Sequence, residues 1–273
     1  FNRMKYTPSK INRWMFLRKF SKNIFEKFDL CLASSKESEI YLNTLGAQNI
    51  KYYGNLKFSN IKDLINENNK NFESSFVDQI KNRNIWCASS THSSEEIICA
   101  EAHKKIKESY NNVLTIIIPR HINRVDSIYK KLSSLNLKVS VFSKLEKVNN
   151  DLDLILIDSY GEALKFYKIS KCVLLGKSLI SSLSKDSGQN PIEPARVGCK
   201  ILHGPHISNF VEIYKYLNTL GVTKQILNAE EIGIEVINEF QKNIKKNDTI
   251  SNKIENYGQS ILNNITKEIE KYI

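Results

Sequence analysis

Between residues 84 and 228, short apolar segments alternate with longer amphipathic ones. The apolar segments include VLTIIIP (113–119) and LDLILID (152–158). They lack the alternation of polar and apolar positions that is typical of a sheet with one solvent-exposed face. Continuous apolar strands of this kind are typical of a parallel sheet covered by helices on both faces. The intervening segments, such as EEIICAEAHKKIKESY (95–110), have the length and polarity of surface helices. The pattern therefore predicts a doubly wound α/β domain over residues 84–250.

The segments outside this region follow other patterns. Residues 12–28 carry apolar side chains at near-helical spacing with five cations between them, and predict an amphipathic helix. A short strand (29–35), a helix that ends at Gly46 and a strand followed by a tight turn at Gly54 come next. Two further helices are predicted after residue 228.

Changes in these patterns indicate the domain boundaries. The chain opens on Phe rather than Met, and residues 1–57 resemble the C-terminal remnant of a second Rossmann-like domain, so we expect an N-terminal part to precede them. Residues 58–83 are rich in Asn and Lys and predict a linker that includes one helix. Residues 251–273 predict a C-terminal helix.

The composition narrows the class of protein. Hydrophobic residues make up 41% of the 273 positions and charged residues 25%, as in globular domains. No apolar run approaches the roughly 20 residues that span a bilayer. The five cysteines show no CxxC pair, which argues against a disulfide framework or a zinc site. The net charge of +11 favours an anionic partner such as nucleic acid, a phosphorylated metabolite or acidic lipid headgroups.

Polar and charged side chains gather where the predicted strands end. The segments are SSTHSSEE, PRH, DSYGE, GKS and GQNPIEP, which begin at residues 89, 119, 158, 176 and 188. The carboxyl ends of parallel strands meet at one edge of the sheet, where the ligands of such domains bind. The sequence therefore predicts a binding crevice at this edge.

The first of these segments allows two interpretations. The hydroxyls of Ser90 and Thr91, with the free main-chain N–H groups of the following helix, suit a phosphate. Alternatively, these residues only cap that helix, with Glu95 or Glu96 in its first turn. Both interpretations remain open at this point.

Two charged residues at other strand ends also suit a nucleotide. Arg120 directly follows a buried strand and offers a forked cation for a phosphate or a carboxylate. Glu193 falls in the first turn of a predicted helix, where it can accept both hydroxyls of a ribose or simply interact with the helix dipole. Neither GxGxxG nor GxxxxGK[ST] occurs, which argues against dinucleotide dehydrogenases and P-loop enzymes. His203 and His206 flank Gly-Pro without metal-ligand spacing, so we expect no metal and no cofactor.

Six motifs resemble, in order, those of the bacterial 3-deoxy-D-manno-octulosonic acid (Kdo) transferases. They are FNRMKYTPSKINRW, CLASSKES…LGAQNIKYYGNLKF, ASSTHSSEE, IIIPRH…R, DSYGE and GQNPIEPA…ILHGPHISNF, and they cover residues 1 to about 215. The resemblance implies a GT-B glycosyltransferase that moves Kdo from CMP-Kdo to a lipid A precursor in lipopolysaccharide biosynthesis. It further implies an inverting, metal-independent reaction at the cytoplasmic face of the inner membrane.

The resemblance also implies roles for particular residues. The CMP moiety is expected to contact Pro119, Arg120, Tyr160, Gly161, Glu162, Asn190, Pro191, Ile192 and Glu193, with Ser90 and Thr91 as further phosphate contacts. Lys57 matches a lysine assigned to transition-state stabilisation. The general base of the family is a glutamate of the N-terminal domain, and no glutamate in residues 1–57 matches it. Two departures from the family occur: Tyr160 replaces a Met, and Gln189 stands where His is common, within a longer and less glycine-rich segment.

The resemblance assigns residues 84–250 to the CMP-sugar donor domain and residues 1–57 to the end of the acceptor domain. Another GT-B enzyme, such as a sugar-nucleotide epimerase, is the alternative within the enzyme class. A basic nucleic-acid-binding module is an alternative from another class, supported only by the net charge of +11. Such a module is expected to show a clustered basic stripe with aromatics, whereas the lysines here are dispersed, so we expect no nucleic-acid partner.

The amphipathic segment 12–28 also allows two interpretations. It combines Trp14, Phe16, Phe20, Phe25 and Phe28 with its cations, a composition suited to an anionic membrane surface. Alternatively, its apolar face packs into the acceptor domain.

Overall fold

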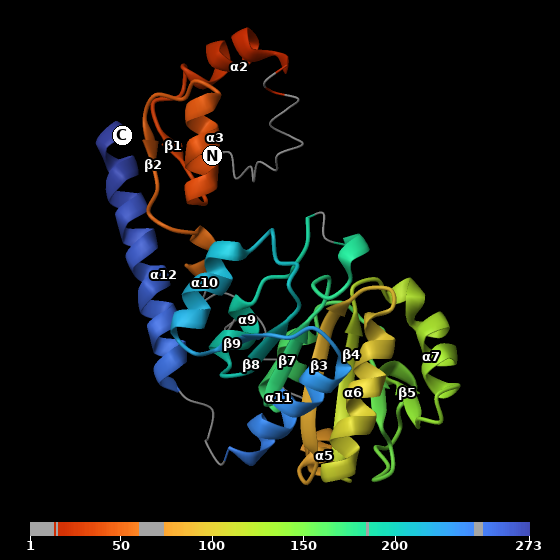
Figure 1. Cartoon of the computed structure of the whole chain (residues 1–273). Coiled ribbons are helices and arrows are strands. Elements are labelled where there is room, and N and C mark those ends of the chain that lie inside the picture. The colour runs from red at the N-terminus through yellow and green to blue at the C-terminus, as the bar shows by residue number, and fades with distance from the viewer. Residues whose placement is uncertain (1–13, 15, 60–73, 184–185, 243–247) are drawn as a thin grey trace. The chain divides into compact units, whose positions relative to one another are not determined.

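The computed structural model describes residues 14, 16–59, 74–183, 186–242 and 248–273, and the chain divides into two compact units (Figure 1). The smaller unit comprises Phe1–Glu67 together with Asn252–Ile273, and the larger unit comprises Asn68–Ser251. The first and last segments of the chain therefore belong to the same unit.

The larger unit is built on a seven-stranded sheet with the order β5-β6-β4-β3-β7-β8-β9. Every neighbouring pair of strands is parallel. The strands are β3 (Asn84–Thr91), β4 (Val113–Pro119), β5 (Val139–Val141), β6 (Leu154–Leu156), β7 (Cys172–Leu175), β8 (Lys200–His203) and β9 (Thr223–Gln225). The predicted parallel α/β architecture is thus confirmed.

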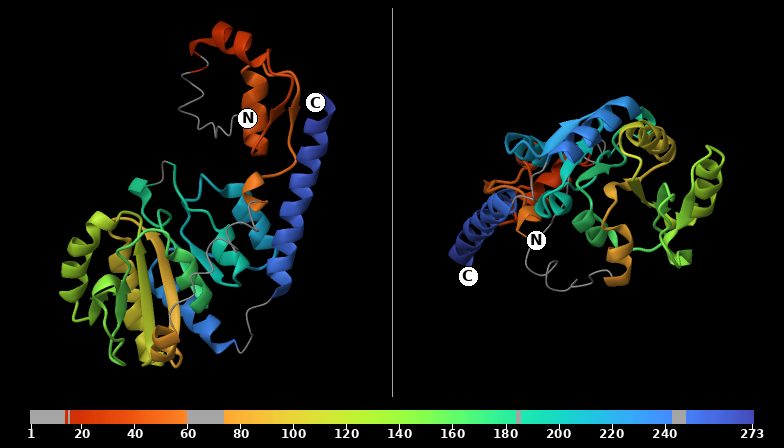
Figure 2. Two further views of the ribbon diagram at one scale, coloured as in Figure 1. Left: turned by 180° about the vertical axis from the view of Figure 1, so that it is seen from behind. Right: turned by 90° about the horizontal axis from the view of Figure 1, so that it is seen from below.

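Helices cover both faces of this sheet (Figure 2). They are α5 (Ser74–Ile80), α6 (Glu95–Ser109), α7 (Val125–Ser133), α8 (Ala163–Ile169), α9 (Ile192–Arg196), α10 (Val211–Thr219) and α11 (Ala229–Gln241). Trp86 and Ala88 of β3 lie in a core cluster with side chains of α6, α7 and α11. Ser89 points to the other face, where its hydroxyl lies 2.6 Å from the hydroxyl of Tyr167 on α8. Burial of β3 on both faces explains its continuous apolar sequence.

The strand order reverses at β3. The chain places β4 on one side of β3 and later returns to place β7 on its other side. In open α/β sheets, the connections that leave such a reversal in opposite directions open a crevice at the carboxyl ends of the strands. The loops that follow β3, β4 and β7 are therefore the expected position of a ligand.

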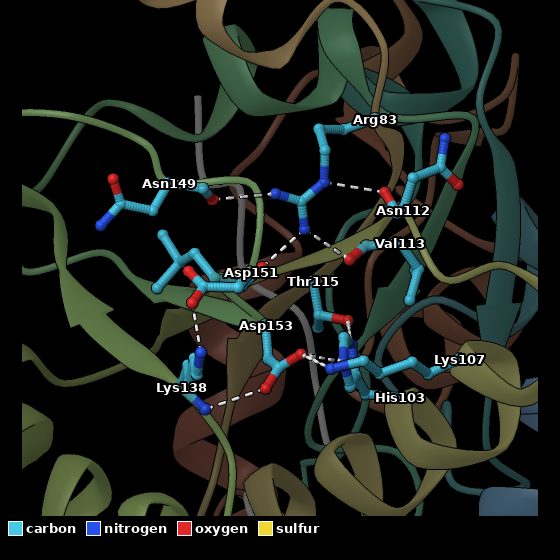
Figure 3. A network of polar contacts seen from close by, with 11 residues as sticks. Arg83, His103, Lys107, Asn112, Val113, Thr115, Lys138, Asn149, Asp151 and Asp153 are labelled. Carbon is cyan, nitrogen blue, oxygen red and sulfur yellow. Dashed lines mark hydrogen bonds and ion pairs between the residues drawn. The ribbon is translucent and has the colours of Figure 1, made fainter.

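The amino-terminal edge of the same sheet carries a network of polar contacts (Figure 3). Arg83 precedes β3, and its guanidinium donates to the main-chain carbonyls of Asn112 (2.8 Å), Val113 (2.7 Å), Asn149 (3.3 Å) and Leu152 (2.5 Å). The buried carboxylate of Asp153, just before β6, accepts hydrogen bonds from His103 Nε2 (3.2 Å), Lys107 Nζ and the main-chain N–H of Lys138 (2.9 Å). Hence the starts of several strands are tied together at the edge opposite the crevice.

The smaller unit contains a parallel pair of short strands, β1 (Cys31–Leu32) and β2 (Ile50–Lys51). Its helices include α2 (Arg18–Phe25) and α3 (Lys36–Thr44). The Ser35 hydroxyl caps α3 by accepting from the main-chain N–H of Ser38 at 3.0 Å. Gly46 follows the end of α3 with a φ of +99°, so the predicted helix end is confirmed.

The C-terminal helix α12 (Asp248–Ile269) contacts the N-terminal part of the chain. The hydroxyl of Tyr53 donates to Glu268 at 2.7 Å, and the rings of Phe58 and Tyr257 meet edge to face at 5.0 Å. Phe58, at the start of the segment expected to be a linker, is only 2% exposed. It ends the 3-10 helix η1 (Leu56–Phe58), while residues 60–73 lie outside the described part of the chain.

The aromatic residues of the segment 12–28 divide between two environments. Phe25 is buried, and its ring lies 5.9 Å from that of Trp14. Phe16, Phe20 and Phe28 are exposed, Phe16 to 90%. Among the helices in the described ranges, none is long and apolar enough to cross a membrane.

Candidate functional site

The ends of β3 and β4 are joined through the main chain. Pro119, the last residue of β4, is buried, and the N–H of Arg120 donates to the carbonyl of Thr91 at 3.0 Å. Arg120 itself is exposed. Its backbone is therefore held by the sheet while its guanidinium is accessible to an anion.

The end of β3 is irregular, and α6 begins after Ser94 without a side-chain cap, so the structure does not show the capping interpretation. The register shifts between Ser89 and Thr91, and Ser90 adopts a φ of +56°. The buried Thr91 hydroxyl donates to Glu96 at 3.0 Å, and Glu96 in turn pairs with Arg124 at 3.0 Å. The Thr91 hydroxyl is thus engaged within the fold, whereas Ser90 is only half-buried at the edge of the crevice.

Glu95 is a residue whose role the sequence did not predict. Its carboxylate is fully buried and accepts four main-chain hydrogen bonds. The donors are the N–H groups of His92 (2.9 Å), Lys177 (2.8 Å), Ser178 (3.0 Å) and Leu179 (3.2 Å). Hydrogen bonds to an ionised acceptor are stronger than neutral ones, so Glu95 ties the start of α6 to the loop after β7. No local signal marks this role, because three of its partners lie far away in the sequence.

Close main-chain contacts explain the glycines of this edge. A Cβ atom on Gly176 would lie 2.5 Å from the carbonyl oxygen of Ser90, and one on Gly204 would lie 2.0 Å from that of Ser178. Between them, Lys177 adopts a φ of +55°, which is uncommon for a residue other than glycine. Its carbonyl accepts from the N–H of Gly188 at 2.7 Å. The loops after β3, β7 and β8 therefore pack backbone against backbone.

The segment from Asn190 to Glu193 forms the start of α9. Asn190 Oδ1 accepts from the N–H of Ile192 at 3.3 Å, while Pro191 and Ile192 are buried. Glu193 lies in the first turn and is half-buried. Burial raises the pKa of this carboxyl, and the nearby Arg196 offsets part of that rise. A carboxylate held in this way has unused acceptor capacity for hydroxyl donors.

A buried aromatic pair supports this segment. The imidazole of His203 lies 4.4 Å from the ring of Tyr214, and its Nδ1 is 2.7 Å from the carbonyl of Gly204. Tyr214 donates its hydroxyl to the carbonyl of Gln189 at 3.3 Å. Desolvation lowers the pKa of His203 despite the opposing effect of the Gly204 carbonyl, which favours the neutral, packed form.

Tyr160, Gly161 and Glu162 lie between β6 and α8. Tyr160 is 67% exposed, and Gly161 has a φ of +81° with open space around its Cα. The Glu162 carboxylate pairs with Lys165 one helical turn further along, at 2.5 Å. An exposed aromatic ring beside such a turn could stack on a base.

Lys57 belongs to the smaller unit, unlike the other predicted site residues. It lies in η1, and its main-chain N–H donates to Asn55 Oδ1 at 3.0 Å. Its side chain is half-buried.

The predicted residues of the larger unit thus come from strand ends, loops and the start of α9 at one edge of one sheet. They provide an accessible guanidinium, a half-buried carboxylate and an exposed ring, groups that suit a phosphate, a ribose and a base respectively. Within the described ranges, no cluster of three or more His, Cys, Asp or Glu side chains could hold a metal ion.

Several known proteins are similar to this chain in sequence. Residues 5–60 match the family described as 3-deoxy-D-manno-octulosonic-acid transferase (kdotransferase). The 3-deoxy-D-manno-octulosonic acid transferase of Rickettsia prowazekii is 27% identical over 269 residues, which cover 95% of this chain and 54% of that protein. The transferase of the same name from Aquifex aeolicus is 29% identical over 234 residues, which cover 86% of this chain and 57% of that protein. The chain therefore spans about half the length of these relatives.

A solved structure has a similar fold. It is the C-terminal CMP-Kdo binding domain of WaaA from Acinetobacter baumannii, with a TM-score of 0.55 and 23% identity, and the match covers 68% of this chain and 94% of that domain. Together with the sequence relatives, it confirms the resemblance to Kdo transferases and the α/β fold of GT-B glycosyltransferases.

Proposed function

We propose that this chain, a relative of the bacterial Kdo transferases, forms the donor-binding part of an enzyme that transfers Kdo from CMP-Kdo to a glycolipid. The main support is the position of Arg120, directly after β4, and Glu193, in the first turn of α9, at the carboxyl edge of one sheet. Residues 84–250 form the donor domain in this proposal, residues 1–57 end an acceptor domain, and residues 58–83 link the two.

The resemblance to the Kdo transferases, together with the chemistry of the side chains, suggests a role for each site residue. Arg120 and the adjacent Pro119 hold the phosphate of CMP, and Glu193 accepts the ribose hydroxyls. Asn190, Pro191 and Ile192 form the wall that carries Glu193. Tyr160, Gly161 and Glu162 line the nucleotide pocket, Ser90 adds a phosphate contact, and Lys57 stabilises the transition state.

In the same proposal, the acceptor is a lipid A precursor and Kdo is transferred with inversion. A glutamate of an N-terminal domain removes the proton from the attacking hydroxyl, as general bases do. Cationic side chains, in place of a metal ion, offset the charge that develops on the departing CMP.

Replacement of Arg120 tests the nucleotide site. Loss of a charge-assisted contact of about 1.5–3 kcal/mol should weaken CMP binding about tenfold or more in Arg120→Ala. Because Arg120 is exposed, the melting temperature of the Arg120→Ala variant should stay close to that of the wild type. Calorimetric titration with CMP measures the effect, and Lys131→Ala, in the last turn of α7, is the charge-matched control. Unchanged CMP affinity in Arg120→Ala would contradict the assignment.

The same titration separates this function from the epimerase alternative. A Kdo transferase should bind CMP in preference to UDP, whereas a UDP-sugar epimerase should show the reverse preference. Equal or stronger binding of UDP would favour the epimerase.

We also propose that the protein acts at an anionic membrane surface, the cytoplasmic face of the inner membrane. The exposed Phe16, Phe20 and Phe28 lie in the same segment as the exposed Lys19, Lys22 and Lys27. Exposed aromatics combined with lysines favour binding to anionic headgroups.

Vesicle co-sedimentation tests the membrane proposal. Replacement of Lys19, Lys22 and Lys27 by Gln should reduce binding to anionic vesicles up to about a hundredfold, because each lysine near such a surface contributes about 1 kcal/mol. Replacement of Lys104, Lys130 and Lys131 on α6 and α7 removes the same charge elsewhere and should leave binding nearly unchanged. Equal losses in both variants would indicate a general charge effect and contradict docking through this segment.

A further inference from the structure

We propose that Lys177 binds an oxyanion of the donor substrate beside His92 and His121, at the carboxyl ends of β7, β3 and β4. The inference rests on the proposed function, because it concerns which group holds the negative charge of CMP-Kdo.

The backbone places Lys177 beside His92. The main-chain N–H groups of both residues donate to the same oxygen, Oε2 of Glu95, at 2.8 and 2.9 Å. The preceding Gly176 lies against Ser90 so closely that a Cβ there would be 2.5 Å from the Ser90 carbonyl. The carbonyl of Lys177 accepts from Gly188, at the start of the segment that carries Asn190 and Glu193. Lys177 therefore lies between the start of α6 and the proposed ribose-binding loop.

Two imidazoles adjoin this position. The ring of His121, next to Arg120, lies 5.9 Å from the ring of His92. His92 Nδ1 is 3.2 Å from the carbonyl of Ser90, which can only accept, so Nδ1 carries the proton. Burial lowers the pKa of His92, and the charges of Lys177 and His121 lower it further, against the opposing effects of the Ser90 carbonyl and Glu95. The charge of Lys177 is thus close enough to act on this imidazole.

The local carboxylate does not neutralise the ammonium group. Glu95 is fully buried, and its oxygens accept main-chain N–H groups. In the part of the chain that the structure describes, Lys177 forms no ion pair. A half-buried cation without a carboxylate partner, beside imidazoles at the crevice, has the chemistry of an oxyanion ligand.

The backbone conformation is a second observation about Lys177. Its φ of +55° would be adopted with less strain by glycine. Nothing in the hydrogen bonding of its backbone requires a side chain, because the N–H and the carbonyl are the groups that bond to Glu95 and Gly188. A lysine that occupies a strained position at a binding edge is consistent with a role for its side chain.

The donor has two oxyanions, the phosphate and the carboxylate of Kdo, and three titrations distinguish them. Calorimetry of the full chain with cytidine, CMP and CMP-Kdo compares the wild type with Lys177→Met, and Lys131→Met is the charge-matched control. The binding affinity is expected to fall about tenfold, equivalent to about 1.4 kcal/mol, in Lys177→Met and to stay unchanged in the control. Weaker binding of CMP and CMP-Kdo assigns Lys177 to the phosphate, and weaker binding of CMP-Kdo alone assigns it to the carboxylate. Unchanged binding of all three ligands, or an equal loss that includes cytidine, would overturn the inference.

Two further variants separate charge from structure. Lys177→Gly removes the charge and relieves the strained φ, so it should lose affinity as Lys177→Met does while its melting temperature is unchanged or higher. Lys177→Arg should recover most of the affinity. Full affinity in Lys177→Gly would refute a role for the charge.

A probe that does not depend on the nucleotide tests the site separately from the proposed function. The chain has five histidines, so the imidazole resonances can be followed individually by NMR. Inorganic phosphate should shift the resonances of His92 and His121 but not those of the buried His103, and the shifts should be reduced in Lys177→Met. Failure of the wild type to bind CMP would refute the proposed function alone, whereas absence of phosphate-induced shifts in the wild type would overturn this site.

Discussion

At the scale of single residues, two glutamates at the crevice differ in what their surroundings provide. The carboxylate of Glu95 has four main-chain donors, so its burial is compensated. Glu193 has no comparable set among the described residues, and burial raises its pKa. A carboxylate of this kind destabilises the ligand-free protein, while its oxygens can accept hydrogen bonds from a ligand. This combination is common in binding sites.

Replacement of Glu193 should therefore separate stability from binding. A raised pKa in the folded state means that the protonated form stabilises the fold below the ordinary value of 4.5, and that this contribution is lost as the pH rises through the folded pKa. At pH 7, Glu193→Gln should thus unfold at an equal or higher urea concentration than the wild type, and the difference should vanish below pH 4.5. Its affinity for CMP should fall about tenfold, because the amide loses one acceptor oxygen.

Urea unfolding at several pH values and CMP titration measure the two effects. Glu101→Gln on the exposed side of α6 is the matched control and should change neither. A stability loss at pH 7 in Glu193→Gln would show that the carboxylate is structurally bound and would contradict the prediction.

At the scale of elements, the two edges of the sheet differ in composition and role. The carboxyl edge is built from glycines that allow close backbone contacts, with charged groups left accessible. The amino edge instead uses two charged side chains, the half-buried Arg83 and the buried Asp153, to hold the strand starts together. The strands β3 and β4 therefore end in crevice loops and begin at structural contacts.

The amino edge should affect stability but not nucleotide binding. Burial by itself raises the pKa of Asp153, but hydrogen bonds from His103, Lys107 and the main chain of Lys138 outweigh burial and lower it well below its usual range. A group whose pKa is depressed in the folded state stabilises the fold above its unfolded pKa. This contribution is lost as the pH falls through its folded pKa. Asp153→Asn should therefore reduce the free energy of unfolding by about 2–4 kcal/mol at pH 7, with partial exposure of Lys107 limiting the effect.

Urea unfolding between pH 2 and 7 checks this prediction. The difference between Asp153→Asn and the wild type should shrink toward pH 2, and CMP affinity of the folded variant should be unchanged. The neighbouring Asp151, which is 61% exposed, offers the control Asp151→Asn with little expected effect. A loss of CMP affinity without a loss of stability would contradict the division between the two edges.

At the scale of the whole molecule, the chain brings its ends into one unit. Tyr53 and Phe58 contact α12, so the smaller unit includes the C-terminal helix as well as the N-terminal segment. Lys57, the proposed transition-state stabiliser, lies in this unit, whereas the proposed CMP contacts lie in the larger one.

The proposed division of labour predicts binding without turnover. Residues 1–273 should bind CMP yet transfer no Kdo to a lipid A precursor, because no glutamate in residues 1–57 matches the general base of the family. Transfer assays with this chain, and with a longer protein that adds the N-terminal domain of a relative, test the prediction. The longer protein should be active, and its variant with the base glutamate changed to Gln should not. Turnover by residues 1–273 alone would require the base to lie within this chain.

Local sequence patterns were sufficient to predict the parallel α/β architecture and the edge that carries the candidate site. The reason is that apolar runs such as 113–119 report burial on both faces, and parallel strands place their carboxyl ends together. Gly46 as a helix end was predicted for a similar reason, because the positive φ required there favours glycine. The roles of individual site residues came from the resemblance to a family and remain predictions.

Contacts between distant segments became evident only in the folded structure. The sequence left Thr91 between phosphate binding and capping, whereas in the structure its hydroxyl donates to the Glu96 carboxylate and α6 has no side-chain cap. The four donors to Glu95, the strained φ of Lys177 and the packing of α12 on the N-terminal segment depend on residues brought together by the fold. Periodicity and spacing describe which face of an element is buried, but not which atoms meet it. Those partners are decided by the packing of strands and loops that are remote from one another along the chain.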